Sequence, residues 1–246
     1  MTEKPWLILT LRRTGGTSLT GFLARISKFR TIEHEPFNDE RLYGAVTARF
    51  RHHADLDRLS SDMAKALAER PNIKHCFEFL PIEVTEALIH QAHQKGYGIL
   101  ILTRRNEARR QLSLSLAMAT GAWGPAQAAE IYPRLMSGEL TVPPIDLAAL
   151  KARVRQDYFA LGRVAALLRN LDVAHDWILF EDLYDVPDQL AAKVCAIAAR
   201  LGIVVEDDDP RLAALACAGG QGSARIGEYI GNFQQAETLL ARLCLR

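Results

Sequence analysis

The sequence predicts an α/β fold with a mostly parallel sheet of about five strands and helices on both faces. Apolar runs of strand length alternate along the chain with segments of helical apolar spacing. The run over residues 98–103 is continuously apolar, as is typical of a parallel strand covered on both faces. With 246 residues, 49% of them hydrophobic and 24% charged, the chain is long enough for one α/β domain with a sizeable core. We therefore expect a single domain over residues 1–246.

The first predicted strand, residues 6–11, runs into a loop with two arginines and two glycines, and helical spacing follows from Leu19 to Ile26. Glycines let the backbone turn sharply, and Thr17 or Ser18 is expected to cap the helix. A helix N-terminus that points back into such a loop favours a phosphate or sulfate, and Arg13 adds a permanent positive charge. An ordinary turn with surface arginines is the alternative.

A second short strand is expected over residues 29–32, followed by Glu33, His34, Glu35 and Pro36. Pro36 disfavours helical torsions at Glu35, so the strand should give way to a loop there. The carboxyl ends of parallel strands share one edge of a sheet, where ligands bind. This places Glu35 on the same edge as the loop after the first strand.

The other elements follow from apolar spacing and from proline and glycine boundaries. Strands are expected over residues 73–79, 98–103 and 173–180. Helices are expected over residues 56–68, 82–94, 126–137, 146–171 and 187–201, from 106 onward, and from 233 onward.

Arg104, Arg105 and Asn106 directly follow the 98–103 strand, and Ser113 comes two turns into the helix that begins near Asn106. One ligand can meet both Arg105 and Ser113 only if it lies along those first two turns. The edge that holds the loop and Glu35 therefore has a third group of polar residues.

These motifs resemble the sulfotransferases. Residues 13–17 resemble the 5′-phosphosulfate loop of that family, and the spacing of eight from Arg105 to Ser113 resembles its 3′-phosphate site. Thr120-Gly121-Ala122-Trp123 resembles the bacterial trehalose 2-sulfotransferases, and Glu35 matches an acidic position of that family and of the Golgi carbohydrate sulfotransferases. A hydrophobic-acidic run at 178–183 is also similar. The resemblance covers residues 6 to about 202, except for 125–170.

The resemblance implies a P-loop-like fold and transfer of a sulfuryl group from 3′-phosphoadenosine 5′-phosphosulfate to an acceptor hydroxyl. The expected acceptor is a carbohydrate or a glycolipid. The other product is adenosine 3′,5′-bisphosphate. The implied donor-binding residues are Arg12, Arg13, Thr14, Gly15, Gly16, Thr17, Ser18, Arg105, Ser113 and Arg225. In the cytosolic sulfotransferases, a run with one arginine and two glycines closes the cofactor site. Arg225, Gly227 and Gly231 resemble this run, with one extra residue in the spacing.

Three residues are expected to be catalytic. The histidine base of the cytosolic sulfotransferases has no match here, which leaves Glu35, or His34 as the alternative, to take the hydroxyl proton. Arg13 would stabilise the charge that grows on the leaving phosphate. Trp123 either stacks on a sugar ring of the acceptor or packs in the core, and both interpretations stay open.

Two other functions stay open. A nucleotide or small-molecule kinase would need a phosphate-loop lysine and a Mg²⁺ site, and the loop has no lysine. A non-catalytic relative would bind the phospholigand without turnover. No metal-ligand spacing is present, and sulfuryl transfer needs no metal, so no metal cofactor is expected.

The composition limits the binding partners and the cellular location that we expect. The net charge is +1 and no long basic block occurs, which argues against nucleic acid or an anionic membrane as a partner. The first apolar run is too short for a signal peptide or a membrane span. Four well-separated cysteines favour reduced thiols and a cytoplasmic location; these are Cys76, Cys195, Cys217 and Cys244. A homodimer is left open.

Overall fold

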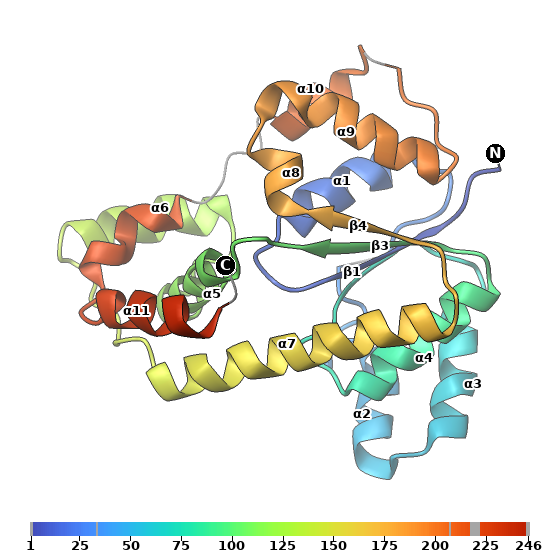
Figure 1. Cartoon of the computed structure of the whole chain (residues 1–246), viewed down its shortest axis with the longest axis horizontal. Helices are drawn as coiled ribbons and strands as arrows, with labels where there is room; N and C mark the ends of the chain where they lie inside the picture. The colour runs from blue at the N-terminus through green and yellow to red at the C-terminus, as the bar shows by residue number, and fades with distance from the viewer. Residues whose placement is uncertain (1, 33, 207, 217–221, 245–246) are drawn as a thin grey trace. The chain divides into compact units, whose positions relative to one another are not determined.

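Figure 1 shows the computed structural model of the chain, which describes residues 2–32, 34–206, 208–216 and 222–244. The chain forms two compact units, each built from two separate stretches. Unit 1 comprises Met1–Thr103 and Phe159–Cys217, and unit 2 comprises Arg104–Tyr158 and Ala218–Arg246. The single domain expected over residues 1–246 stays a prediction.

Unit 1 contains a parallel sheet of four strands in the order β2-β1-β3-β4. The strands are β1 (Trp6–Thr10), β2 (Ile73–Cys76), β3 (Gly98–Thr103) and β4 (His175–Leu179). The predicted α/β class and the parallel pairing are confirmed. The predicted count of about five strands is not confirmed: among the residues that the structure describes, the sheet has four strands.

The missing strand is the one expected over residues 29–32. Only an isolated parallel bridge between Thr31 and Asn72 forms there. The side chain of Asn72 links this segment to β1 by hydrogen bonds to the backbone. Its Oδ1 accepts from the amide of Trp6 at 3.0 Å, and its Nδ2 donates to the carbonyl of Phe29 at 3.0 Å. The polar side chain thus ties the segment to the sheet without a continuous run of paired backbone. Glu33, which follows this segment, lies outside the described residues.

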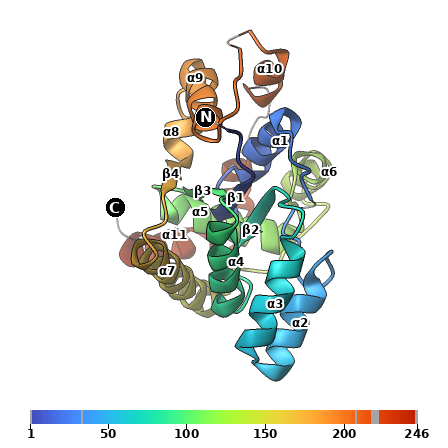
Figure 2. The ribbon, with the colours of Figure 1, turned by 90° about the vertical axis from the view of Figure 1, so that its right-hand side faces the viewer.

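Helices cover both faces of the sheet, as predicted (Figures 1 and 2). Side chains of a strand alternate between faces, so Leu7 and Leu9 join one apolar cluster while Trp6 and Ile8 join another. The first cluster contains residues from α2 (Gly44–His53), α3 (Leu56–Ala66), α4 (Ile82–Gln94) and the second half of α7 (Leu147–Asn170). The other contains residues from α1 (Gly16–Ile26), α8 (Phe180–Tyr184), α9 (Pro187–Arg200) and α10 (Pro210–Ala216).

Unit 2 has a helical core of its own. It contains α5 (Glu107–Thr120), α6 (Pro125–Met136), the first half of α7, the 3₁₀-helix η1 (Ser223–Tyr229) and α11 (Phe233–Leu243). Leu116, Leu150 and Leu240 are among its buried residues. Residues 125–170, which had no counterpart in the resemblance, therefore provide α6 and α7.

Among the described residues, none of the helices is both long and apolar enough to span a membrane. Cys76 and Cys244 are buried as reduced thiols, and Cys217 lies outside the described residues.

Candidate functional site

The loop between β1 and α1 has the backbone of an anion-binding loop. Arg13 and Gly15 both have left-handed torsions, with φ of 69° and 75°. Alternation of left- and right-handed torsions turns successive amide N–H groups toward one side, and such a concavity binds anions. Gly15 is also the N-cap of α1, so the positive end of the helix faces the loop. No side chain caps this helix, and the expectation that Thr17 or Ser18 caps it is wrong, because the helix begins two or three residues earlier than that cap required.

Internal hydrogen bonds fix the shape of the loop. The hydroxyl of Thr14 donates to the carbonyl of Leu11 at 2.8 Å and lies 2.5 Å from the hydroxyl of Thr10. From α8, the hydroxyl of Tyr184 donates to the carbonyl of Gly15 at 2.9 Å. A Cβ at Gly15 would lie 2.5 Å from a ring carbon of Tyr184, so only glycine fits here. The hydroxyls of buried Thr14 and of Tyr184 therefore fix the backbone of the loop.

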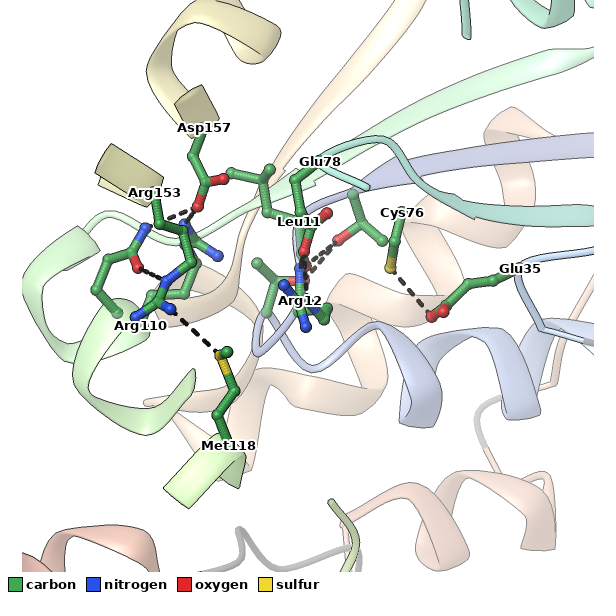
Figure 3. Close-up of polar contacts among 12 residues, drawn as sticks. Leu11, Arg12, Glu35, Cys76, Glu78, Arg110, Met118, Arg153 and Asp157 are labelled. Carbon is green, nitrogen blue, oxygen red and sulfur yellow. Dashed lines mark hydrogen bonds and ion pairs between the residues drawn. The ribbon is translucent and has the colours of Figure 1, made fainter. Parts of the chain in front are cut away.

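Arg12 is bound to a buried carboxylate beside the loop. Glu78 Oε1 accepts from the backbone amide of Arg12 at 2.7 Å and from its Nε at 2.9 Å, and the Glu78 side chain is 1% exposed. The guanidinium carbon of Arg12 lies 3.6 Å from the centroid of the Phe79 ring, within range of a cation–π contact. Figure 3 shows Arg12, Glu78 and Leu11 gathered at this point. These contacts make Arg12 a residue that holds the loop in place.

Lys74, in β2, is a candidate site residue that the sequence did not reveal. It is only 7% exposed, and its Nζ lies 2.8 Å from Glu35 Oε1. A Cβ added at Gly16 would lie 3.2 Å from Lys74 Cε, so the lysine side chain runs against the first residue of α1. The anion loop thus has a buried cation at its side. A lysine near the start of the predicted strand over residues 73–79 was the signal that could have identified it, because lysine is almost never buried without a partner.

Glu35 makes several further contacts. Its Oε1 also accepts from the thiol of Cys76 at 3.1 Å, and its Oε2 accepts from Asn38 Nδ2 at 3.1 Å. Figure 3 shows the Cys76 and Glu35 side chains directed toward each other. The Glu35 amide donates to the carbonyl of Lys74 at 3.1 Å, which attaches this segment to β2 through the backbone as well. The structure therefore brings Glu35 to the loop edge, as predicted.

The charges of this cluster depend on one another. Burial acts to raise the pKa of Glu35, but the charge of Lys74 and hydrogen bonds from Lys74, Cys76 and Asn38 outweigh it and lower the pKa to about 2. Burial acts to lower the pKa of Lys74, but the negative charge of Glu35 and the hydrogen bond to it act in the opposite direction and raise this pKa. Burial raises the pKa of the Cys76 thiol well above its usual value. At neutral pH the cluster is therefore an ammonium, a carboxylate and a neutral thiol.

His34, the alternative base, is exposed next to this cluster. Partial burial of the ring, and then the positive charge of Lys74, lower its pKa, against an opposite effect from Glu35. The imidazole is therefore mostly neutral at pH 7 and able to take a proton.

In unit 2, Asn106 caps α5 with its own side chain. Its Oδ1 accepts from the amide of Arg109 at 3.0 Å. Ser113 lies two turns along the same helix and is partly exposed, and Arg105 is exposed just before the cap. The predicted helix after Asn106 is confirmed, and it carries Ser113 at the predicted position.

A buried network in unit 2 joins α5 to α7 (Figure 3). Arg110 is fully buried and donates to Glu107 at 2.6 and 2.7 Å, and it also binds Asp157. Gln111 Nε2 donates to Asp157 at 2.7 Å, and Arg153 Nη2 donates to Ser115 at 2.7 Å. Each buried charge has an opposite charge in contact, as a buried network requires. The contacts hold α5, and with it Ser113, against α7.

The remaining predicted site residues lie in unit 2. The Trp123 side chain is 44% exposed, so the interpretation that it packs in the core is wrong. Arg225 is exposed on η1. The residues expected at the donor and acceptor thus fall into two groups: the loop, Glu35 and His34 in unit 1, and Arg105, Ser113, Trp123 and Arg225 in unit 2.

Comparisons with family models, with curated proteins and with solved structures find no match for this chain. Within the described part of the chain, no three His, Cys, Asp or Glu residues are grouped so that they could hold a metal ion. The functional argument therefore depends on the loop, the Lys74–Glu35 pair and the sequence motifs.

Proposed function

We propose that the chain transfers a sulfuryl group from 3′-phosphoadenosine 5′-phosphosulfate to a hydroxyl of a carbohydrate or glycolipid. The observation that carries the proposal is the buried Lys74–Glu35 pair beside Gly16. It provides a cation and a carboxylate next to the anion loop, and sulfuryl transfer needs one to stabilise the leaving phosphate and the other to take a proton. The resemblance of residues 13–17, and of Arg105 with Ser113, favours this donor and a P-loop-like fold.

In the proposed reaction the acceptor oxygen bonds to sulfur while the bond from sulfur to the bridging oxygen breaks. The electron pair of the broken bond stays on the 5′-phosphate of adenosine 3′,5′-bisphosphate. The loop amides, Arg13 and Lys74 stabilise this charge, which grows in the transition state. The hydroxyl proton goes to Glu35, with neutral His34 as the alternative acceptor.

The unit 2 residues serve recognition in this proposal. Arg105 and Ser113 bind the 3′-phosphate, because an arginine pairs with phosphate through several charge-assisted hydrogen bonds. Arg225 contributes to the same donor. Exposed Trp123 stacks on a sugar ring of the acceptor.

One observation favours a second candidate. Lys74 supplies a cation beside the loop, which is what the kinase alternative lacked. A nucleotide or small-molecule kinase would use it on the phosphates of ATP and would need Mg²⁺ as well.

Calorimetric titration separates the two candidates. Adenosine 3′,5′-bisphosphate should bind without a metal and at least about tenfold more tightly than AMP, because AMP lacks the charge-assisted 3′-phosphate contact. Ser113→Ala should reduce this preference, and Ser137→Ala, at the end of α6, is the matched control. Equal binding of the two nucleotides, or tight binding of ATP that depends on Mg²⁺, would reject the sulfotransferase and support the kinase.

A further inference from the structure

We propose that Lys74 is shared between Glu35 and the anion that the loop binds, so that anion binding takes the ammonium away from Glu35 and only then makes this carboxylate a proton acceptor. The role of Glu35 as proton acceptor rests on the proposed function. The transfer of Lys74 from the carboxylate to an anion does not, and it can be measured separately.

The position of Lys74 permits the exchange. Its Cε lies against Gly16, the first residue of α1, while its Nζ, one bond further along, contacts Glu35 Oε1 at 2.8 Å. An anion held by the amides at this helix terminus is therefore within reach of the ammonium by rotation of the last bonds of a flexible side chain.

Glu35 is held in place independently of the ion pair. Its backbone amide donates to the carbonyl of Lys74, and its Oε2 accepts from Asn38. The thiol of Cys76, on the same face of β2 as Lys74, donates to Oε1. When the ammonium turns away, these three contacts keep the carboxylate at the loop edge.

The ion pair also suppresses the basicity of Glu35 in the free protein. A general base acts best when its pKa lies near the working pH, and the Glu35 pKa of about 2 lies far below it. Once the ammonium faces a bound anion, Glu35 is left half-buried near a second negative charge, and both effects favour its protonated form. Among the described residues, the other groups that contact or lie near Glu35 are Cys76 on β2, and His34 and Asn38 on its own segment. His75 points to the opposite face of β2, where it contacts Thr85, and only the charge of Glu35 acts on it.

The arrangement makes proton removal conditional on donor binding. Without an anion in the loop, Glu35 stays an ion-paired, weakly basic carboxylate. With the phosphosulfate bound, the same lysine stabilises the leaving group and no longer holds Glu35. One residue thereby couples occupation of the donor site to activation of the acceptor hydroxyl.

Carbon-13 NMR of the Glu35 carboxyl, assigned with Glu35→Gln, tests the inference with inorganic sulfate as the probe, because sulfate does not titrate between about pH 4 and 7. Without sulfate, the Glu35 signal should stay that of a carboxylate across this range. With saturating sulfate, a titration midpoint should appear at about pH 4.5 or above, the ordinary value for this side chain. A signal that remains unchanged while sulfate is bound overturns the inference.

Two variants complete the experiment. Lys74→Met should bring the Glu35 midpoint close to its ordinary value without sulfate, and sulfate should shift it far less than in the unaltered protein. Arg13→Ala should weaken sulfate binding and move the titration to higher sulfate concentration. If the sulfate-dependent midpoint appears but no sulfuryl transfer is found, the inference holds and the proposed function fails. If the protein transfers sulfuryl groups but the Glu35 signal does not respond to sulfate, the proposed function holds and the inference fails.

Discussion

Arg13 and Glu35, the two residues expected to act on the leaving group and on the acceptor proton, both have left-handed backbone torsions, with φ of 69° and 58°. A residue with a side chain rarely adopts this region, and such torsions persist only where the surroundings enforce them. At Arg13 the enforcing contacts are the hydrogen bonds that hold Arg12 and Thr14 on either side of it. Both torsions therefore belong to a loop edge that is shaped before any ligand arrives.

Arg13→Gly should separate function from stability. Glycine removes a left-handed strain of about 1–2 kcal/mol but adds about 0.5–1 kcal/mol of backbone entropy, so the free energy of unfolding should stay level or rise by about 1 kcal/mol. Turnover of the phosphosulfate donor should fall more than donor affinity, because the lost guanidinium acts most strongly in the transition state. Urea unfolding and steady-state kinetics measure both. Ala54→Gly, at another left-handed position (φ 51°), is the control and should leave turnover intact; a kcat unchanged in Arg13→Gly contradicts the role.

Glu35→Gln should keep or raise the donor affinity, because Lys74 no longer pairs with a carboxylate, and it should lose turnover. The amide keeps the size of the side chain and an acceptor for Cys76, but it cannot take a proton, so kcat should fall by about 10²–10⁴-fold. Calorimetry with adenosine 3′,5′-bisphosphate and a transfer assay provide the two readouts. His34→Gln is the matched variant: full loss of turnover there, with substantial activity in Glu35→Gln, would identify His34 as the base.

Arg110→Met should destabilise the protein strongly. It leaves Glu107 and Asp157 as buried carboxylates without their cation, a change that costs about 3–5 kcal/mol. Arg134→Met breaks the exposed ion pair with Glu139 in the same unit and should cost less than about 1 kcal/mol. Urea denaturation of both variants measures the difference, and equal losses would show that the buried network does not stabilise unit 2.

Acidification should destabilise unit 1 through His75. The side chain is fully buried against Thr85, and burial lowers its pKa from 6.5 to about 4, so the unfolded chain binds a proton more readily than the folded one. The contribution of neutral His75 to the free energy of unfolding is therefore fully present above about pH 6.5. It falls as the pH drops toward 4, by a total on the order of 3 kcal/mol. The low pKa of Glu35 acts only below about pH 4.5, outside most of this window.

Urea titrations at about pH 7 and pH 5 measure this effect. The loss of stability between the two should shrink in His75→Asn and persist in His90→Asn, which changes an exposed histidine. A loss of the same size in both variants would assign the acid sensitivity to other groups.

Elements with clear boundary residues were predictable from the sequence. The bounds of α4 and β3 agree with the prediction, because Pro81 and Gly96 delimit the helix and a continuous apolar run defines the strand. By contrast, α2 was not expected, because only its first turns are buried and its sequence has little amphipathic spacing. Tertiary packing supplies the stability that the local pattern does not show.

The site was predictable only in its local parts. The loop and the placement of Glu35 followed from glycine, arginine and proline patterns, but contacts across the sequence did not. Lys74 contacts Glu35, which is 39 positions away in the sequence, and Tyr184 contacts Gly15, which is 169 positions away. The division into two units was hidden as well, because α7 continues without a break from unit 2 into unit 1.

The strand order has a consequence for the chain during synthesis. β3 pairs with β4 in the finished sheet, yet residues 104–174 separate them in sequence. At roughly 5–20 residues per second, a ribosome delivers β4 roughly 4–14 seconds after β3. Until then one edge of β3, which is apolar from Ile99 to Leu102, has open amides and carbonyls of the kind that other strands pair with. The nascent polypeptide should therefore be more prone to aggregation than the completed protein. Slower translation across residues 104–174 would lengthen the time during which this edge of β3 is unpaired.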